Sequence, residues 1–238
     1  MSADLVLKDG SVEIWSLLGS GDSRRVEALL TLYARLFPQY AHYVPRMRRR
    51  AAFGAERRAG HIVHYWLVEV DGQPAGLRTF RYVRDRHVGL AHALAVDPAY
   101  RGQVVGGQRL SIFLVNACLD QIIADARAVG DLPALGIANE VESPKLMQHY
   151  RKHGALELPV KYVEPIFPPE QGHSPAELSQ IRFSPMALGF LPDPALQLER
   201  CSNEMISDFS LAFLADHYGL PVEHPQVQAV LDSIPVLS

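Results

Sequence analysis

The residues best suited to chemistry lie in a loop between an apolar run at 90–96 and a helical pattern that begins near residue 108. This loop, residues 100–107, has the sequence Tyr-Arg-Gly-Gln-Val-Val-Gly-Gly. A strand, a glycine-bearing loop and a helix start together form an anion site, because the free N–H groups of the first helical turn point into the loop and the helix dipole favours negative charge. Arg101 adds a positive charge suited to phosphate, and Gly106 lets the backbone approach such a group closely. By itself, the arrangement is equally typical of a loop that only connects a strand to a helix and binds no ligand.

Other common sites do not fit this sequence. The loop lacks the Gly-Lys-Ser/Thr end of a P-loop, and no acidic residue stands where a dinucleotide-binding fold needs one. His61 and His64 lie on one predicted strand with their side chains on opposite faces, and no cysteine or carboxylate completes a set, so we expect no metal. The sequence has no nucleophile elbow and no Cys/His pair placed by a motif, so we do not expect a covalent acyl-enzyme.

Hydrophobic periodicity and turn signals predict the elements that position the loop. Before it, we expect helices and strands at 12–18 (strand), 23–37 (helix), 45–58 (helix), 61–70, 73–83 and 88–96 (strands). After it, we expect a helix at 108–129, a strand at 133–138, a helix at 144–153 and one or two strands within 155–163. Asp71-Gly72 is a strong hairpin signal between two of the strands. Strands that precede and follow helices in this order predict a mixed α/β layer arrangement.

Two stretches carry a family resemblance. The first, Leu-Ala-Val-Asp-Pro-x-Tyr-Arg-Gly-x-x-x-Gly at 94–106, resembles the coenzyme A loop of the GNAT superfamily, the acyl-coenzyme A-dependent N-acyltransferases. The family pattern is Arg/Gln-x-x-Gly-x-Gly/Ala. Here Arg101 and Gly106 stand at its ends, while Val104 replaces the middle glycine and Gly107 follows directly.

The second stretch, residues 138–156, resembles the family's Asn followed by a helix that ends Tyr-x-Lys-x-Gly-Phe. That ending is matched by Tyr150, Lys152 and Gly154. The usual position of the Asn falls on Ser143, whereas Asn139 lies four residues earlier, so both are candidates.

The resemblance implies a GNAT-like fold over about residues 12–166. This is an α/β class with a mixed, mostly antiparallel central sheet flanked by helices. It also implies acetyl-coenzyme A as co-substrate, no metal, and direct attack of an acceptor amine on the thioester. In the family, the loop and the backbone of the central strand contact the cofactor. These contacts transfer to Leu94, Ala95, Val96, Arg101, Gly102, Gln103, Val104, Gly106 and Gly107. The further cofactor-binding candidates are Asn139 and Ser143.

Two side chains are candidates for proton transfer. By resemblance, Tyr150 gives a proton to the leaving sulfur, and a phenol pKa of about 10 is close to that of a thiol. His92 stands where family members often place a carboxylate base, and imidazole titrates near neutrality. A histidine in an apolar strand is equally typical of a hydrogen-bonded core residue. Glu69 and Glu140 are the fallback bases.

Composition excludes several classes. The chain has 238 residues and a formal charge of −3, which argues against general nucleic-acid binding. Its 2 cysteines are too few for a disulfide framework. No apolar run approaches the roughly 18 residues that span a bilayer, and the start shows no signal-peptide pattern. We therefore expect a cytoplasmic protein with no membrane or nucleic-acid partner.

The last part of the chain is rich in proline. We expect a division into an acyltransferase domain at 1–166 and a partly helical extension at 167–238, with helices at 202–218 and 225–234. This extension is too apolar to be disordered. We expect it to pack on the domain, over the acceptor site or on a partner subunit, which makes a homodimer a candidate assembly.

A basic cluster precedes the hairpin, with arginines at 46, 48, 49, 50, 57 and 58. It is either a solvated helix face or a contact for an anionic acceptor or for the 3′-phosphate of the cofactor.

Two functions are consistent with these patterns. The first is an N-acetyltransferase that acts on a primary amine of a small molecule or peptide. The alternative is a non-catalytic binding or regulatory module of the same fold, in which Val104 weakens the coenzyme A loop. Binding of acetyl-coenzyme A separates the two.

Overall fold

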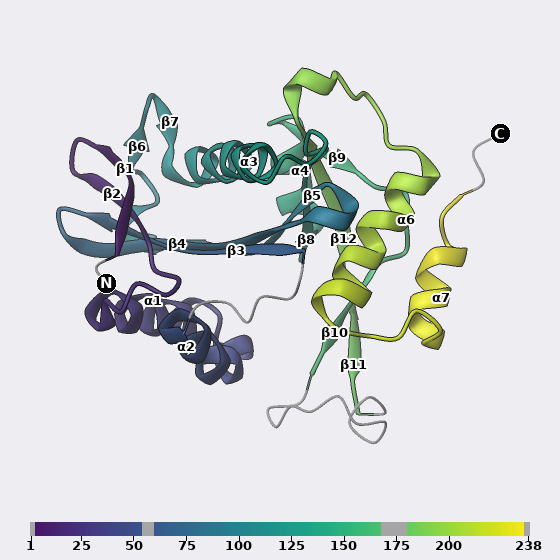
Figure 1. Cartoon of the computed structure of the whole chain (residues 1–238), viewed down its shortest axis with the longest axis horizontal. Coiled ribbons are helices and arrows are strands. Elements are labelled where there is room, and N and C mark those ends of the chain that lie inside the picture. Colours follow the sequence, from purple (N-terminus) through teal and green to yellow (C-terminus); the bar gives the residue numbers. More distant parts are fainter. Residues whose placement is uncertain (1–2, 54–59, 168–179, 236–238) are drawn as a thin grey trace. The chain divides into compact units, whose positions relative to one another are not determined.

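The chain forms two compact units (Figure 1). The structure is a computed structural model that describes residues 3–53, 60–167 and 180–235. Unit 1 comprises Met1–Tyr82 and Ala91–Asp125, and unit 2 comprises Val83–Leu90 and Ala126–Ser238. Strand β5 (Val88–Val96) begins in unit 2 and continues in unit 1.

Unit 1 is built on a sheet with the strand order β1-β2-β3-β4-β5. Its other strands are β1 (Asp4–Asp9), β2 (Val12–Ser16), β3 (His61–Val70) and β4 (Gln73–Val83). β2 is antiparallel to β1 and to β3, in a register that sets Trp15 opposite Leu67. Asp71 and Gly72, with φ of 49 and 72, form the predicted turn between β3 and β4. β1 is missing from the prediction because its side chains are mostly exposed, so no buried face marks the strand.

Helices cover both faces of this sheet (Figure 1). α1 (Ser23–Leu36) and α2 (Val44–Phe53) lie on one face, with the 3-10 helix η1 (Pro38–Tyr43) between them, and α3 (Leu110–Ala128) lies on the other. The core beneath α1 and α2 includes Leu29, Leu30, Met47, Leu67 and Leu77. α1 begins at the predicted residue and ends at Leu36, one residue before the predicted end. The rest of the second predicted helix, with Arg57 and Arg58, lies outside the described residues.

Unit 2 continues with the strand order β5-β8-β12-β9. Its strands are β8 (Gly136–Val141), β12 (Ala187–Pro192) and β9 (Leu156–Glu157). β12 is antiparallel to both neighbours, with Phe190 opposite Ala138 on β8 and Leu156 on β9. A Cβ on Gly136, whose φ is 146, would lie 2.2 Å from the Leu191 carbonyl oxygen, so this close pairing needs glycine. The prediction placed β8 three residues too early and had no strand at β12.

Helices and a hairpin complete unit 2. They are α4 (Pro144–Arg151), the antiparallel pair β10 (Val163–Ile166) and β11 (Arg182–Pro185), α6 (Asn203–Leu211), the π-helical turn η5 (Ala212–His217) and α7 (Pro225–Asp232). The predicted helix at 202–218 is thus α6 followed by η5. Its aromatic side chains enter the core of unit 2, where the rings of Phe190 and Phe209 stack at 4.5 Å between centroids.

The expected fold class is confirmed, because a mostly antiparallel main sheet is flanked by helices. The expected division at residue 166 stays a prediction. Residues beyond it are integral to unit 2, since they provide β12, which lies between β8 and β9.

Candidate active site

The end of β5 is fixed by Asp97. Its backbone N–H donates to the Ala75 carbonyl at 2.8 Å, and its side chain accepts from the Ala99 N–H at 2.9 Å, which caps the 3-10 turn η3 (Pro98–Tyr100). Arg35 of α1 forms an ion pair with the same carboxylate. The Ala99 N–H and the Arg35 guanidinium lower the pKa of Asp97, so this anchor stays charged at neutral pH.

The segment after η3 is a short hairpin rather than an open loop. β6 (Val104–Val105) pairs antiparallel with β7 (Gln108–Arg109), and Gly106 and Gly107, with φ of 54 and 77, form the turn. The Leu110 N–H donates to the Gln103 carbonyl at 2.9 Å and closes the base of the hairpin. The prediction of a helix that starts at 108 is therefore wrong by two residues. Two valines followed by Gly-Gly favour strands and a two-residue turn instead.

This hairpin presents charge and backbone to solvent at the start of α3. Arg101, Gly102, Gly107 and Arg109 are exposed, and Val104 is 55% exposed, so its side chain does not fill the turn. Arg109 is a further positive charge that the family pattern does not mark. The two glycines and two arginines fit an anionic group such as a diphosphate.

The carboxylate of Asp9 forms a hydrogen bond with the turn of this hairpin. The Gly106 N–H donates to Oδ2 of Asp9, at the end of β1, at 2.9 Å. Sequence reasoning missed Asp9 because β1 itself was missed; the signal was Gly10, whose φ of 57 forms the turn between β1 and β2. The carboxylate therefore accepts a hydrogen bond from a backbone N–H of the glycine turn.

The candidate strand residues lie beside the hairpin in unit 1. Leu94, Ala95 and Val96 are partly exposed on β5. β4 comes very close to them, since a Cβ on Gly76 would lie 2.9 Å from the Ala95 carbonyl oxygen. The assignment of this backbone to the cofactor stays a prediction.

His92 belongs to a row of basic side chains. Arg81 of β4 is 4% exposed; its Nε donates to Nε2 of His92 at 2.9 Å, and its Nη1 lies 3.3 Å from Nδ1 of His61. Burial and the nearby guanidinium groups lower the pKa of His92 well below its usual value; the guanidinium groups are those of Arg81, Arg78, Arg50 and Arg46. A neutral imidazole whose Nε2 accepts from arginine is a weak proton acceptor.

The predicted basic cluster divides between surface and interior. Arg48 is exposed and binds Glu27 at 2.7 Å, as a solvated helix face does. Arg46 and Arg50 are partly buried, and their positive charges contribute to the lowered pKa of His92.

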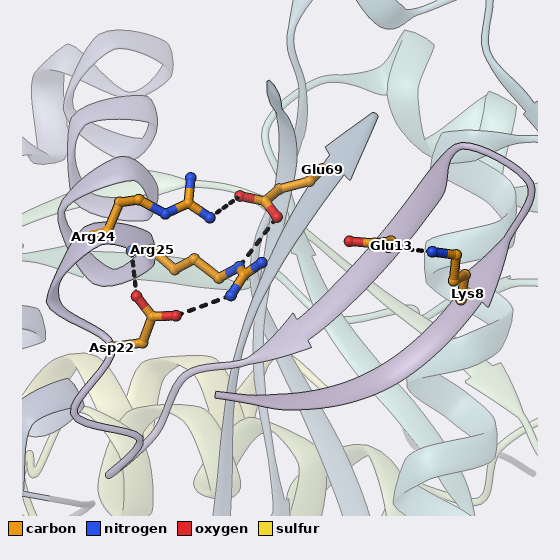
Figure 2. Close-up of polar contacts among 6 residues, drawn as sticks. All are labelled: Lys8, Glu13, Asp22, Arg24, Arg25 and Glu69. Atoms are coloured by element: carbon orange, nitrogen blue, oxygen red, sulfur yellow. Dashed lines mark hydrogen bonds and ion pairs between the residues drawn. The ribbon is translucent and has the colours of Figure 1, made fainter. Parts of the chain in front are cut away.

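Glu69, a fallback base, holds helix α1 to the sheet (Figure 2). Its carboxylate binds Arg24 at 3.3 Å and Arg25 at 3.1 Å, and Arg25 also binds Asp22, the cap of α1, at 3.0 Å. Glu69 is 1% exposed, so this carboxylate is closed to solvent. The two histidines that were considered for a metal contact different partners, as expected for opposite faces: His61 contacts Arg81, and His64 binds Asp125 of α3 at 2.7 Å.

Unit 2 holds the other predicted residues. Ser143 caps α4, since its Oγ accepts from the Leu146 N–H at 3.2 Å. Asn139 is partly exposed on β8 and lies over Gly189 of β12, where a Cβ would meet its Nδ2 at 3.2 Å. Tyr150 is half-buried near the end of α4 and packs against the cluster of Val141 and Met147. The three candidates therefore lie on two consecutive elements of unit 2: Asn139 is on β8, Ser143 caps α4, and Tyr150 is in α4.

Glu140, the other fallback base, lies next to Asn139 and is partly buried among hydroxyl groups. Tyr162 donates to its Oε1 at 2.6 Å, and Tyr218 donates to its Oε2 at 2.8 Å. Burial, together with the charge of Glu164, raises the pKa of Glu140 to about 8. Sequence reasoning missed these three partners, because no local pattern relates them to β8.

Two further findings concern metals and membranes. Within residues 3–53, 60–167 and 180–235, no group of three or more His, Cys, Asp or Glu side chains is placed to hold a metal ion. In the same ranges, no helix has the length and apolar character to cross a membrane.

Residues 26–132 match the family model for the acetyltransferase (GNAT) family. This match includes α1, α2, β3–β5, the hairpin and α3. No significant match to a curated protein sequence was found.

Several solved structures are similar to this chain. A Bacteroides thetaiotaomicron protein assigned to the GNAT family is 16% identical, with a TM-score of 0.49, and the match covers 87% of this chain and 99% of that one. The enzyme from Salmonella typhimurium that modifies the N-terminal serine of ribosomal protein L7/L12 is 11% identical, with a TM-score of 0.46, covering 79% and 97%. A ribosomal L7/L12 α-N-protein acetyltransferase in complex with coenzyme A is 12% identical, with a TM-score of 0.49, covering 81% and 99%.

Proposed function

We propose that this chain, which carries a domain of the GNAT acetyltransferase family over residues 26–132, transfers an acetyl group from acetyl-coenzyme A to a primary amine. The acceptor is a small molecule or a peptide. Its nitrogen attacks the thioester directly, so that a C–N bond forms as the C–S bond breaks. The nitrogen loses a proton and the sulfur gains one.

The observation that carries the proposal is the exposed basic hairpin at the start of α3, inside the matched region. Gly106 and Gly107 expose backbone that can approach a diphosphate, and Arg101 and Arg109 supply charge. We assign the diphosphate of acetyl-coenzyme A to this hairpin and its pantetheine arm to the backbone of Leu94–Val96. Asp9 has to release the Gly106 N–H when the diphosphate binds.

Two side chains are assigned to the proton transfers. Tyr150 gives its proton to the leaving sulfur, which suits a half-buried phenol at the end of α4. His92 is the base expected from position. Its bond from Arg81 and its lowered pKa both weaken it in that role.

Calorimetric titration with acetyl-coenzyme A tests the proposal first. We expect the wild type to bind and the Arg101→Ala and Gly106→Trp variants to lose binding. Gly72→Trp is the matched control, because Gly72 also has a positive φ, of 72, and open space around it, yet lies in the β3–β4 turn. Thermal unfolding verifies that all four proteins are folded.

Acetyl transfer is then measured as thiol release with spermidine, L-lysine and a hexapeptide that has a free N-terminus. Turnover with one of these amines supports the proposed reaction. A folded wild type that does not bind acetyl-coenzyme A contradicts it and favours a non-catalytic binding module.

A further inference from the structure

Basic side chains gather on the face of the unit 1 sheet that α1 and α2 cover (Figure 1). Side chains an even number of residues apart share one face of a strand. Arg81 of β4 therefore lies on the side of Leu77, which packs in the core beneath these helices. His61 of β3 likewise shares a face with Val63, which packs against the same core. His92 of β5 joins them through its hydrogen bond from Arg81, and all of these residues belong to unit 1.

Helix α2 adds two guanidinium groups to this place. Arg46 and Arg50 are four residues apart, so they share one face of the helix, and Met47 beside them is buried in the core above the sheet. Both arginines are partly buried, whereas Arg49 is exposed. The charges with the largest effect on the pKa of His92 all lower it, and they are those of Arg81, Arg78, Arg50 and Arg46. The surroundings of His92 are therefore electrically positive.

The proposed function sets the reacting thioester next to these charges. The diphosphate is assigned to the hairpin after β5 and the pantetheine arm to Leu94–Val96, so the arm runs back along β5 and its acyl end points toward His92. His92 precedes Leu94 by two residues, which is about 7 Å along an extended strand. Thr79 of β4 fixes this part of β5, since its hydroxyl accepts the Ala93 N–H at 3.2 Å. An acceptor that reaches the thioester therefore comes close to the arginines.

Positive surroundings select among amines. They disfavour an ammonium group and favour the neutral amine that attacks a thioester. They also repel an acceptor that carries further positive charges, whereas they attract a carboxylate, whose two oxygens match the fork of a guanidinium group. Polyamines should therefore be poor acceptors, and amines that carry a carboxylate should be good ones.

We propose that Arg46 and Arg50 bind a carboxylate that the acceptor carries close to its amine, so that the acceptor of this chain is an amino acid or a similar carboxylate-bearing amine. This inference rests on the proposed function, because the reaction defines where the acceptor lies. Arg81 is only 4% exposed. It is a positioning residue, which holds His92 and adds to the positive charge that the acceptor meets.

Matched pairs of acceptors test the charge requirement. L-lysine and L-lysinamide differ only in the carboxylate, which is a neutral amide in the second compound, and β-alanine and β-alaninamide differ in the same way. We expect kcat/KM to be about 10-fold higher for the acid of each pair, as for one charge-assisted hydrogen bond. Spermidine should be a poor acceptor. Equal kcat/KM values within both pairs overturn the inference.

Variants of α2 assign the effect to its arginines. Arg50→Gln should raise KM for L-lysine about 10-fold and leave KM for L-lysinamide unchanged, because the lost contact is with the carboxylate. Arg46→Gln should act in the same way. Arg49→Gln, which removes an exposed arginine of the same helix, is the matched control and should change neither value. Thermal unfolding verifies that each variant is folded. A KM that rises equally for the acid and the amide contradicts the inference, since a purely structural role predicts that result.

Two readouts separate this inference from the proposed function. Calorimetry should show equal binding of acetyl-coenzyme A to the wild type and to Arg50→Gln. Loss of that binding in the variant would assign Arg50 to a phosphate of the cofactor and overturn the inference.

The second readout, ¹⁵N-histidine NMR, needs no turnover. The resonance that His92→Gln removes should shift when N-acetyl-β-alanine is added to the wild type, and it should not shift with N-acetyl-β-alaninamide. No shift with either compound, or equal shifts with both, overturns the inference. A shift confined to the acid, in a protein that transfers no acetyl group, supports the carboxylate site and contradicts the proposed reaction.

Discussion

The glycine hairpin of unit 1 and the surroundings of Glu140 in unit 2 are opposite settings. The hairpin is exposed and local, because Arg101, the Gly106-Gly107 turn and Arg109 follow one another along the chain. The site of Glu140 is partly buried and assembled from distant segments, since Glu140 accepts from Tyr218, 78 positions further along the chain. Solvent screens the first set of charges, whereas the fold itself sets the protonation of the second. Changes in unit 2 should therefore alter stability, and changes in the hairpin should alter binding.

The largest effect is expected from Gly136→Ala in unit 2. The new Cβ would lie 2.2 Å from the Leu191 carbonyl oxygen, and φ at this position is 146. Because β8 and β12 must then separate, we expect a loss of about 3 kcal/mol or more in the free energy of unfolding. Urea denaturation followed by circular dichroism measures it.

Gly130→Ala is the control for that experiment. Gly130 also has a positive φ, of 70, but a Cβ there meets nothing within 4 Å. It should cost only about 1–2 kcal/mol, from backbone strain. Equal losses of unfolding free energy in the two variants would show that the close pairing of β8 with β12 adds nothing to the cost of Gly136→Ala.

The same contrast explains what sequence can and cannot predict. The β3–β4 turn depends on neighbouring residues alone, and the Asp71-Gly72 pattern predicted it. The glycines before α3 also lie in one short stretch, but the pattern there predicted a loop and a helix from residue 108, whereas the structure has a hairpin and a helix that begins at Leu110. β12 was missed because its register partner lies about fifty residues earlier, from Ala187 to Val141. Tyr162, Glu164 and Tyr218 were missed for the same reason: only packing brings them to Glu140.

A second, smaller effect concerns the pH dependence of stability. The folded-state pKa of Glu140 is raised to about 8 from the usual value of 4.5. Between those values the folded state binds more protons than the unfolded state, so stability falls as pH rises. This contribution is fully present below the unfolded pKa and is lost as pH rises through the folded pKa. After allowance for partial exposure, we expect it to be about 1–3 kcal/mol.

Glu140→Gln isolates that contribution. Because the glutamine cannot ionise, the free energy of unfolding of the variant should fall less between pH 5 and pH 8 than that of the wild type. Urea denaturation at the two pH values gives the comparison, with Glu142→Gln, an exposed neighbour two residues along the chain, as control. If the wild type and Glu140→Gln lose stability in parallel, Glu140 does not hold a proton at neutral pH.

The smallest effect is expected in unit 1, from Asp9→Asn. The Asp9 carboxylate accepts the Gly106 N–H at 2.9 Å, so it competes with the diphosphate for that amide and repels its charge. Asparagine keeps an acceptor and loses the charge. We expect acetyl-coenzyme A to bind about 2–5-fold more tightly, which corresponds to less than about 1 kcal/mol at an exposed position.

Calorimetry at two salt concentrations measures this gain, which should shrink at high salt because the charges are exposed. Glu13→Gln is the matched control: Glu13 lies on the same β1–β2 hairpin and binds Lys8 at 2.7 Å instead of the glycine turn (Figure 2). Removal of its charge should leave binding unchanged. If Asp9→Asn weakened binding, the carboxylate would be a support of the hairpin rather than a competitor of the ligand. The exposed hairpin of unit 1 would then depend on a contact from a distant segment, as the partly buried Glu140 of unit 2 does, and the contrast between the two units would not hold.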